Sequence, residues 1–122
     1  MTALDMKKLE SALENRARTL ASSLAERNQI AVERSADDFD ATVLAAERES
    51  SARFMTHDYQ LLRQVEAALG RMREGNFGVC LRCEEEIAHK RLQVVPWAAY
   101  CVSCQEKAEE DETAAPELAR VA

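Results

Sequence analysis

Apolar residues recur at steps of three and four residues along two long stretches of the chain. The first series is Leu9, Leu13, Ala17, Leu20 and Leu24, and the second is Phe54, Leu61, Val65, Ala68 and Met72, with one polar slot at His57/Asp58. This spacing is typical of the narrow apolar seam of a coiled coil. No glycine precedes Gly70 and no proline precedes Pro96. The first 69 residues therefore contain no obvious helix breaker.

A hairpin is the expected arrangement of this segment. One helix of about 70 residues would run roughly 105 Å and leave its seam exposed unless it dimerised. The best place to turn is ERSADDFD, residues 33–40, where Ser35 or Asp37 can cap the second helix with Asp38 or Asp40 at the third position of a capping box. The pattern predicts helices over about 3–33 and 38–73, each arm roughly 45–55 Å long.

We therefore expect a mainly α fold that begins with an antiparallel coiled-coil hairpin. Two C-x-x-C pairs follow, Cys80/Cys83 and Cys101/Cys104, whose spacing predicts a four-cysteine zinc finger, and a short C-terminal helix ends the fold. The expected division places the hairpin at 1–74, with its tip near 34–40, the finger at 75–107, and an acidic helix and tail at 108–122. Pro116 is expected to begin a frayed tail.

Composition narrows the class of partner. The chain has 122 residues and a net charge of −6, so a basic protein or a protein cleft suits it better than duplex DNA. The N-terminus lacks the apolar region of a signal peptide, and no apolar run approaches the roughly 20 residues that span a bilayer. These features predict a soluble, cytoplasmic protein with no membrane partner.

All four cysteines lie between residues 80 and 104. They form two C-x-x-C pairs, Cys80/Cys83 and Cys101/Cys104, separated by the 17 residues 84–100. Because a reducing cytosol disfavours disulfides, this spacing predicts a tetrahedral zinc–thiolate site. Four thiolates close the coordination shell, so the zinc is expected to be structural and the protein is not expected to be an enzyme.

Two other interpretations of the cysteine segment stay open. A redox or disulfide role is one, although a redox site needs only a single C-x-x-C pair. A nucleic-acid-reading finger is the other, but the basic residues of the segment are offset by acidic ones: Arg82, Lys90, Arg91 and Lys107 against Glu84, Glu85, Glu86 and Glu106. Without a basic face, attraction to phosphate is weak. His89 is expected to be a surface residue and not a ligand.

The cysteine segment resembles the DksA/TraR family of bacterial RNA polymerase-binding regulators. The matching residues are Phe77, Gly78, Cys80, Cys83, Glu86, Ile87, Arg91, Leu92, Pro96, Cys101, Cys104 and Gln105. The resemblance implies a protein that binds no promoter DNA and inserts its hairpin into the secondary channel of RNA polymerase, with acidic residues at the tip. The family's tip pattern, D-x-x-D-x-A, falls on Asp37, Asp40 and Thr42, where threonine replaces the alanine.

Two further departures from the family pattern bear on function. Glu84 stands where the family usually has glycine after the second cysteine. The basic residues that bind the alarmone ppGpp in responsive members have the counterparts His57, Gln64, Val95 and Gln105. Because a polyphosphate is best bound by Arg or Lys, a response to ppGpp is doubtful.

The resemblance implies a non-enzymatic transcription regulator, and two rival functions stay open. One is a zinc-stapled adaptor that binds another protein through its acidic helices. The other is a factor that stimulates transcript cleavage by polymerase, since such factors also carry an acidic hairpin tip. The acidic residues at the tip also have a purely structural interpretation, because carboxylates at a helix start cap free N–H groups.

Overall fold

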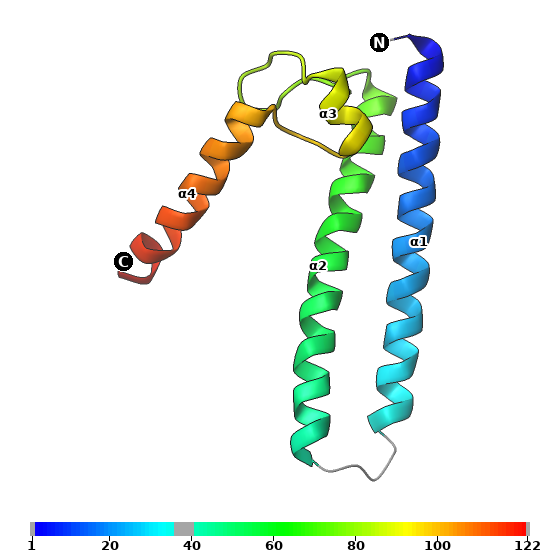
Figure 1. Ribbon diagram of the computed structural model, residues 1–122, viewed down its shortest axis with the longest axis vertical. Coiled ribbons are helices and arrows are strands. Elements are labelled where there is room, and N and C mark those ends of the chain that lie inside the picture. Colours follow the sequence, from blue (N-terminus) through cyan, green and yellow to red (C-terminus); the bar gives the residue numbers. More distant parts are fainter. Residues whose placement is uncertain (1, 36–40, 122) are drawn as a thin grey trace.

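The computed structural model describes residues 2–35 and 41–121, with side chains for residues 2–30, 43 and 45–112. It contains α1 (Ala3–Ser35), α2 (Ala41–Glu74), α3 (His89–Val94) and α4 (Val102–Val121). In Figure 1, α1 and α2 lie side by side and antiparallel. Helix α3 lies at the end of the pair where α1 begins and α2 ends, which we call the root, and α4 projects away from the pair (Figure 1). Among the described residues the only β structure is an isolated bridge between Val79 and Glu86. The predicted mainly α fold is confirmed.

The first helix starts from a capping box that the sequence analysis missed. The Asp5 amide donates to the Thr2 hydroxyl oxygen at 3.1 Å, and the Thr2 amide donates back to the Asp5 carboxylate at 3.1 Å. The Thr2 hydroxyl also donates to that carboxylate at 2.8 Å. Hydrogen bonding to Thr2 lowers the pKa of Asp5. The signal was the sequence T-x-x-D, a variant of the usual capping pattern.

The helix ends differ in part from the prediction. Ser35 is the last residue of α1, so it does not cap α2, which begins at Ala41. Asp37, Asp38 and Asp40, where the tip was predicted, lie outside the described residues. At the other end of the chain α4 continues through Pro116 to Val121, so the proline does not end the helix as expected.

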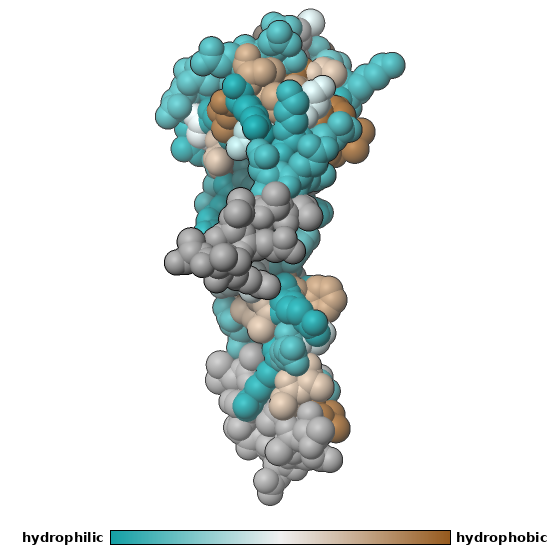
Figure 2. All heavy atoms as spheres, turned by 90° about the vertical axis from the view of Figure 1, so that its left-hand side faces the viewer, coloured by the Kyte–Doolittle hydropathy of each residue, from teal (hydrophilic) through white to brown (hydrophobic). Residues whose placement is uncertain are grey.

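The apolar core lies at the root of the hairpin, where the finger meets it. Leu9, Leu13 and Leu20 of α1 and Val65, Ala68 and Leu69 of α2 are buried in one cluster with residues of the finger, namely Phe77, Cys80, Ile87, Leu92, Ala98 and Cys104. On the face shown in Figure 2, apolar atoms gather at the finger end, and further apolar atoms lie on the lower part of the hairpin. None of the helices in the described parts of the chain is long and apolar enough to cross a membrane.

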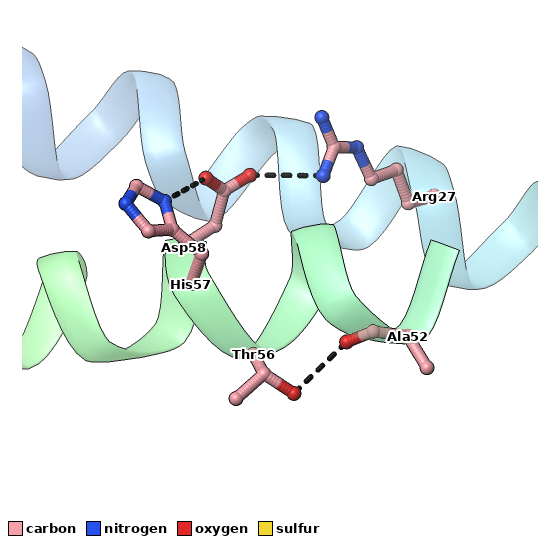
Figure 3. Close-up of polar contacts among 5 residues, drawn as sticks. All are labelled: Arg27, Ala52, Thr56, His57 and Asp58. Atoms are coloured by element: carbon pink, nitrogen blue, oxygen red, sulfur yellow. Dashed lines mark hydrogen bonds and ion pairs between the residues drawn. The ribbon is translucent and has the colours of Figure 1, made fainter. Parts of the chain in front are cut away.

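Away from the root, the seam between α1 and α2 is no longer purely apolar. Phe54, predicted to lie in the seam, is 59% exposed, so that prediction is wrong. The next position of the seam, the polar slot of the pattern, is filled by Asp58, whose side chain is 18% exposed and lies 3.1 Å from Nη1 of Arg27 on α1. Figure 3 shows this carboxylate between the two helices, with His57 beside it. An ion pair between the helices therefore replaces an apolar pair, and the aromatic ring is left outside.

Candidate metal centre

Two glycines carry the chain from α2 into the finger. Gly75 and Gly78 have φ values of +79° and +87°, a left-handed conformation that glycine adopts without strain. The amide of Asn76 donates to the carbonyl of Arg71 at 2.9 Å, which closes the last turn of α2. The helix consequently ends a few residues before the first cysteine, and the chain turns back over the hairpin root.

The first cysteine pair lies on a tight turn held by backbone hydrogen bonds. The amide of Cys80 donates to the carbonyl of Glu85 at 2.8 Å, and the amide of Glu84 donates to the carbonyl of Cys80 at 3.0 Å. Glu84 has a φ of +63° and is the one non-glycine residue with positive φ among the described residues. The turn therefore keeps the left-handed geometry that glycine favours, although this chain carries glutamate there.

The second cysteine pair lies at the start of α4. Cys101 immediately precedes the helix and Cys104 is in its first turn, with the amide of Gln105 donating to the carbonyl of Cys101 at 2.8 Å. The amide of Leu81, between the cysteines of the first pair, donates to the carbonyl of Ala99 at 2.9 Å. This hydrogen bond joins the two turns and brings the four sulfurs to one place.

The sulfur atoms have the spacing that zinc requires. The four Sγ atoms of Cys80, Cys83, Cys101 and Cys104 all lie within 4.8 Å of one another. The Cys83 and Cys101 sulfurs are 3.8 Å apart, and a tetrahedral shell with Zn–S bonds of about 2.3 Å has edges of about 3.8 Å. Four soft thiolates in this arrangement fit Zn²⁺ and leave no open coordination position for a substrate.

The thiols of this cluster do not ionise alike. Burial opposes ionisation of Cys80, but backbone amides that include that of Cys83 outweigh it and lower the pKa of Cys80 to about 6. The hydrogen bond with Cys101, together with burial, raises the pKa of Cys104 to about 12. Four negative sulfurs so close together repel one another unless a cation lies between them. Zinc would supply that charge, and its binding would release the remaining protons.

Contacts from the hairpin hold the finger in place. The guanidinium of Arg16 on α1 lies over the ring of Trp97, 5.9 Å from its centroid. From α2, Nη2 of Arg71 donates to the carbonyl of Ala98 at 3.5 Å, and burial lowers the pKa of Arg71. Because Cys80 and Cys104 are both buried in the core cluster, the metal site and the hairpin root form one packed unit.

The other residues singled out in the sequence are scattered. Thr42 belongs to the first turn of α2, and Asp37 and Asp40 lie outside the described residues. His89 is exposed and hydrogen-bonded to Gln93 at 3.1 Å, away from the sulfur cluster.

The four positions compared with ppGpp-binding residues do not form a cationic group. His57 lies beside Asp58 in the middle of the hairpin, and Val95 packs against the core. Gln105 donates to Glu109 at 3.2 Å. Gln64 is exposed on α2. None of the four is a lysine or arginine, so the expectation about ppGpp stays a prediction.

Residues 75–110 match the family described as "Prokaryotic dksA/traR C4-type zinc finger". The resemblance drawn from the sequence is therefore confirmed, and with it structural zinc as the cofactor of this segment. General stress protein 16O of Bacillus subtilis is 42% identical over 64 residues, which cover 52% of this chain and 39% of that protein. The RNA polymerase-binding transcription factor DksA of Escherichia coli K12 is 33% identical over 67 residues, covering 53% of this chain and 44% of that protein. The matches thus span less than half the length of these relatives.

The fold as a whole has a solved counterpart. The transcription factor DksA2 of Pseudomonas aeruginosa superposes with a TM-score of 0.80 over 93% of this chain and 89% of that one, at 21% sequence identity. At this identity the likeness concerns the fold, which includes the helical hairpin that the family match at residues 75–110 does not cover.

Proposed function

We propose that this protein binds bacterial RNA polymerase and regulates transcription by inserting the α1–α2 hairpin into the secondary channel. One observation carries the proposal: a DksA/TraR-type zinc finger is packed into a single core with the root of an antiparallel hairpin. The Escherichia coli relative is named as an RNA polymerase-binding transcription factor. The role of polymerase as the partner of this chain rests on that relationship.

The dimensions of the hairpin suit a probe. Helices α1 and α2 have 33 and 34 residues, and at 1.5 Å per residue each is about 50 Å long. Core packing fixes the root of the hairpin against the finger. The hairpin should therefore keep its direction relative to the finger when its far end meets a partner. By sequence, Asp37 and Asp40 follow the far end of α1, where two carboxylates could compete for basic side chains or perturb a site organised by metal ions.

Direct reading of DNA has less support. Two of the basic residues in the finger are already engaged within the protein: Arg82 pairs with Asp111 at 3.1 Å, and Nε of Arg91 donates to the carbonyl of Tyr100 at 3.0 Å. The zinc with four thiolates would add about two negative charges. The finger therefore serves as a brace for the hairpin, and the closed zinc shell gives it no catalytic role.

Pull-down with core polymerase, followed by multi-round transcription with purified components, tests the proposal. The wild-type protein should co-purify with polymerase and change transcript yield. Asp37→Asn with Asp40→Asn should abolish the change in yield while binding largely survives. Glu10→Gln with Glu14→Gln is a matched control, because it removes two exposed carboxylates near the hairpin root.

Each of these measurements has a result that would contradict the proposal. If the wild-type protein does not bind polymerase, the adaptor function takes its place. Regulation that is unchanged in the double aspartate variant would reject the role of the tip. Stimulated RNA cleavage in stalled complexes would identify the protein as a cleavage factor.

A further inference from the structure

The half of the hairpin nearer the loop exposes apolar side chains that the root half buries. Ile30, Val43 and Phe54 are 44%, 51% and 59% exposed, whereas Leu20 and Leu24 are 6% and 3% exposed. The change occurs at the Arg27–Asp58 ion pair. Beyond this pair, apolar surface faces solvent on a stiff arm, where it contributes little to the fold.

The guanidinium of Arg27 lies over the ring of Phe54, which is exposed outside the seam. This guanidinium lies 3.1 Å from the Asp58 carboxylate and 5.4 Å from the centroid of the Phe54 ring. Nη1 of Arg27 is buried and its N–H groups are not well aligned with the carboxylate, so this contact is an ion pair and not a directed hydrogen bond. In Figure 3, Arg27 and Asp58 meet across the gap between the helices. The ring is thus supported on one side by a cation and open on the other.

Two shallow hollows meet at Phe54. One is lined by Arg27, Glu47, Ser50, Ser51 and Phe54. The other is lined by Ser50, Arg53, Phe54 and His57. Both share Ser50 and Phe54, so the aromatic ring stands between them, and the small serine side chains leave room for groups of a partner. We call the residues that line the two hollows the Phe54 surface: Arg27, Glu47, Ser50, Ser51, Arg53, Phe54 and His57.

The charges of the Phe54 surface indicate what it binds. Arg53 is the one formally charged group in the second hollow, in a chain whose net charge is −6. A partner that covers this hollow should therefore carry a carboxylate beside an apolar side chain. A second copy of this chain is a poorer fit, because a two-fold axis through the surface would bring each Arg53 close to its own counterpart.

We propose that the Phe54 surface is a second contact with RNA polymerase, which binds an apolar side chain flanked by a carboxylate on the polymerase. This inference rests on the proposed function. Phe54 is 13 residues from Ala41 and 20 residues from Glu74, about 20 Å from the loop end of α2 and about 30 Å from the root. A hairpin inserted by its tip would bring this surface against the channel wall, where it would fix how far the arm enters.

The test measures the affinity of the labelled full-length protein for core polymerase. Phe54→Ala should weaken binding by about tenfold or more, as truncation of a central aromatic anchor does. Arg53→Glu should weaken it as well, and the loss should shrink at high salt because it is electrostatic. Both side chains are exposed, so the thermal melt of each variant should match the wild type.

Tyr59→Ala is the matched control. It also removes an aromatic ring from α2, and Tyr59 is 43% exposed, but five residues along a helix it points to a different face. Its affinity should be unchanged. An equal loss in Tyr59→Ala would overturn the assignment to the Phe54 surface.

The possible failures are distinguishable. If wild-type protein does not bind polymerase, the proposed function fails and this inference fails with it. If the wild type binds and Phe54→Ala binds equally well, only the inference is overturned. If light scattering shows that Phe54→Ala converts a dimer into a monomer, the surface binds a second copy and the inference is likewise overturned.

Discussion

Replacing Glu84 with glycine should tighten zinc binding. Glu84 has a φ of +63° in the turn that carries Cys80 and Cys83. A residue with a Cβ atom pays about 1–2 kcal/mol in this left-handed region, where glycine is unstrained. Glycine also has more freedom in the unfolded chain, which offsets part of the gain. We expect Glu84→Gly to stabilise the finger by about 0.5–1 kcal/mol, or about two- to fivefold in apparent zinc affinity.

The adjacent glutamate provides a control of the same charge. Glu85 does not share the positive φ of Glu84, and its carbonyl, which accepts from the Cys80 amide, survives substitution. Glu85→Gly removes the same negative charge but only adds freedom to the unfolded chain, so it should cost about 0.5–1 kcal/mol. The two variants should therefore differ by about 1–2 kcal/mol, or about five- to thirtyfold in zinc affinity.

A chelator competition measures this difference. Trp97 is the single tryptophan of the chain and packs against the core cluster, so its fluorescence reports whether the finger is folded. Zinc is withdrawn with increasing chelator and the midpoints of the two variants are compared. Equal shifts in both would mean that lost charge, and not backbone strain at Glu84, governs the stability of the turn.

Three further predictions concern the hairpin and are read from thermal or urea unfolding. Leu13→Ala empties a site with 0% exposure and should cost about 2–5 kcal/mol, whereas Leu4→Ala, at a position 63% exposed, should change stability little. Gly70→Ala adds a Cβ with nothing within 4 Å, four residues before the end of α2, and should stabilise the helix by about 0.5–1 kcal/mol; a loss would show an undetected close contact. Asp58→Leu combined with Arg27→Leu extends the apolar seam and should equal or exceed wild-type stability, while Asp58→Leu alone should be less stable than the pair.

The root half of the hairpin could be predicted from the sequence because its apolar spacing is regular. Leu9, Leu13, Leu20 and Leu24 are all buried as the pattern indicated. The prediction for the half of the hairpin farther from the root was wrong at Phe54, because this residue was assigned to the seam by its hydrophobicity alone. Asp58 occupies the polar slot of the pattern, and the long side chain of Arg27 reaches it from α1 (Figure 3). Which residue of α1 meets this slot could not be inferred from the spacing, because the Arg27 side chain extends along the hairpin before it reaches Asp58 (Figure 3).

The zinc site was predictable from spacing, but its local geometry was not. The two C-x-x-C pairs indicated the ligands, because few other chemistries need four thiols at that spacing. The positive φ of Glu84 could not be inferred from the residue itself, since glutamate seldom adopts it. Nor could the sequence show that Arg16 lies over Trp97, because that contact depends on how the finger folds back against α1.

Two of the four clustered cysteines are also core residues, so a metal ion bound by the cluster would be linked to the packing of the hairpin against the finger. Cys80 and Cys104 are 1% and 6% exposed and belong to the same cluster as Leu9 and Leu13 of α1. Zinc binding supplies on the order of 10 kcal/mol to the folding of such a finger. Since α1 and α2 pack against the folded finger, part of that free energy also restrains their angle to it. A hairpin that works as a probe needs this restraint, because an arm of about 50 Å turns a small rotation at the root into a large displacement at the loop.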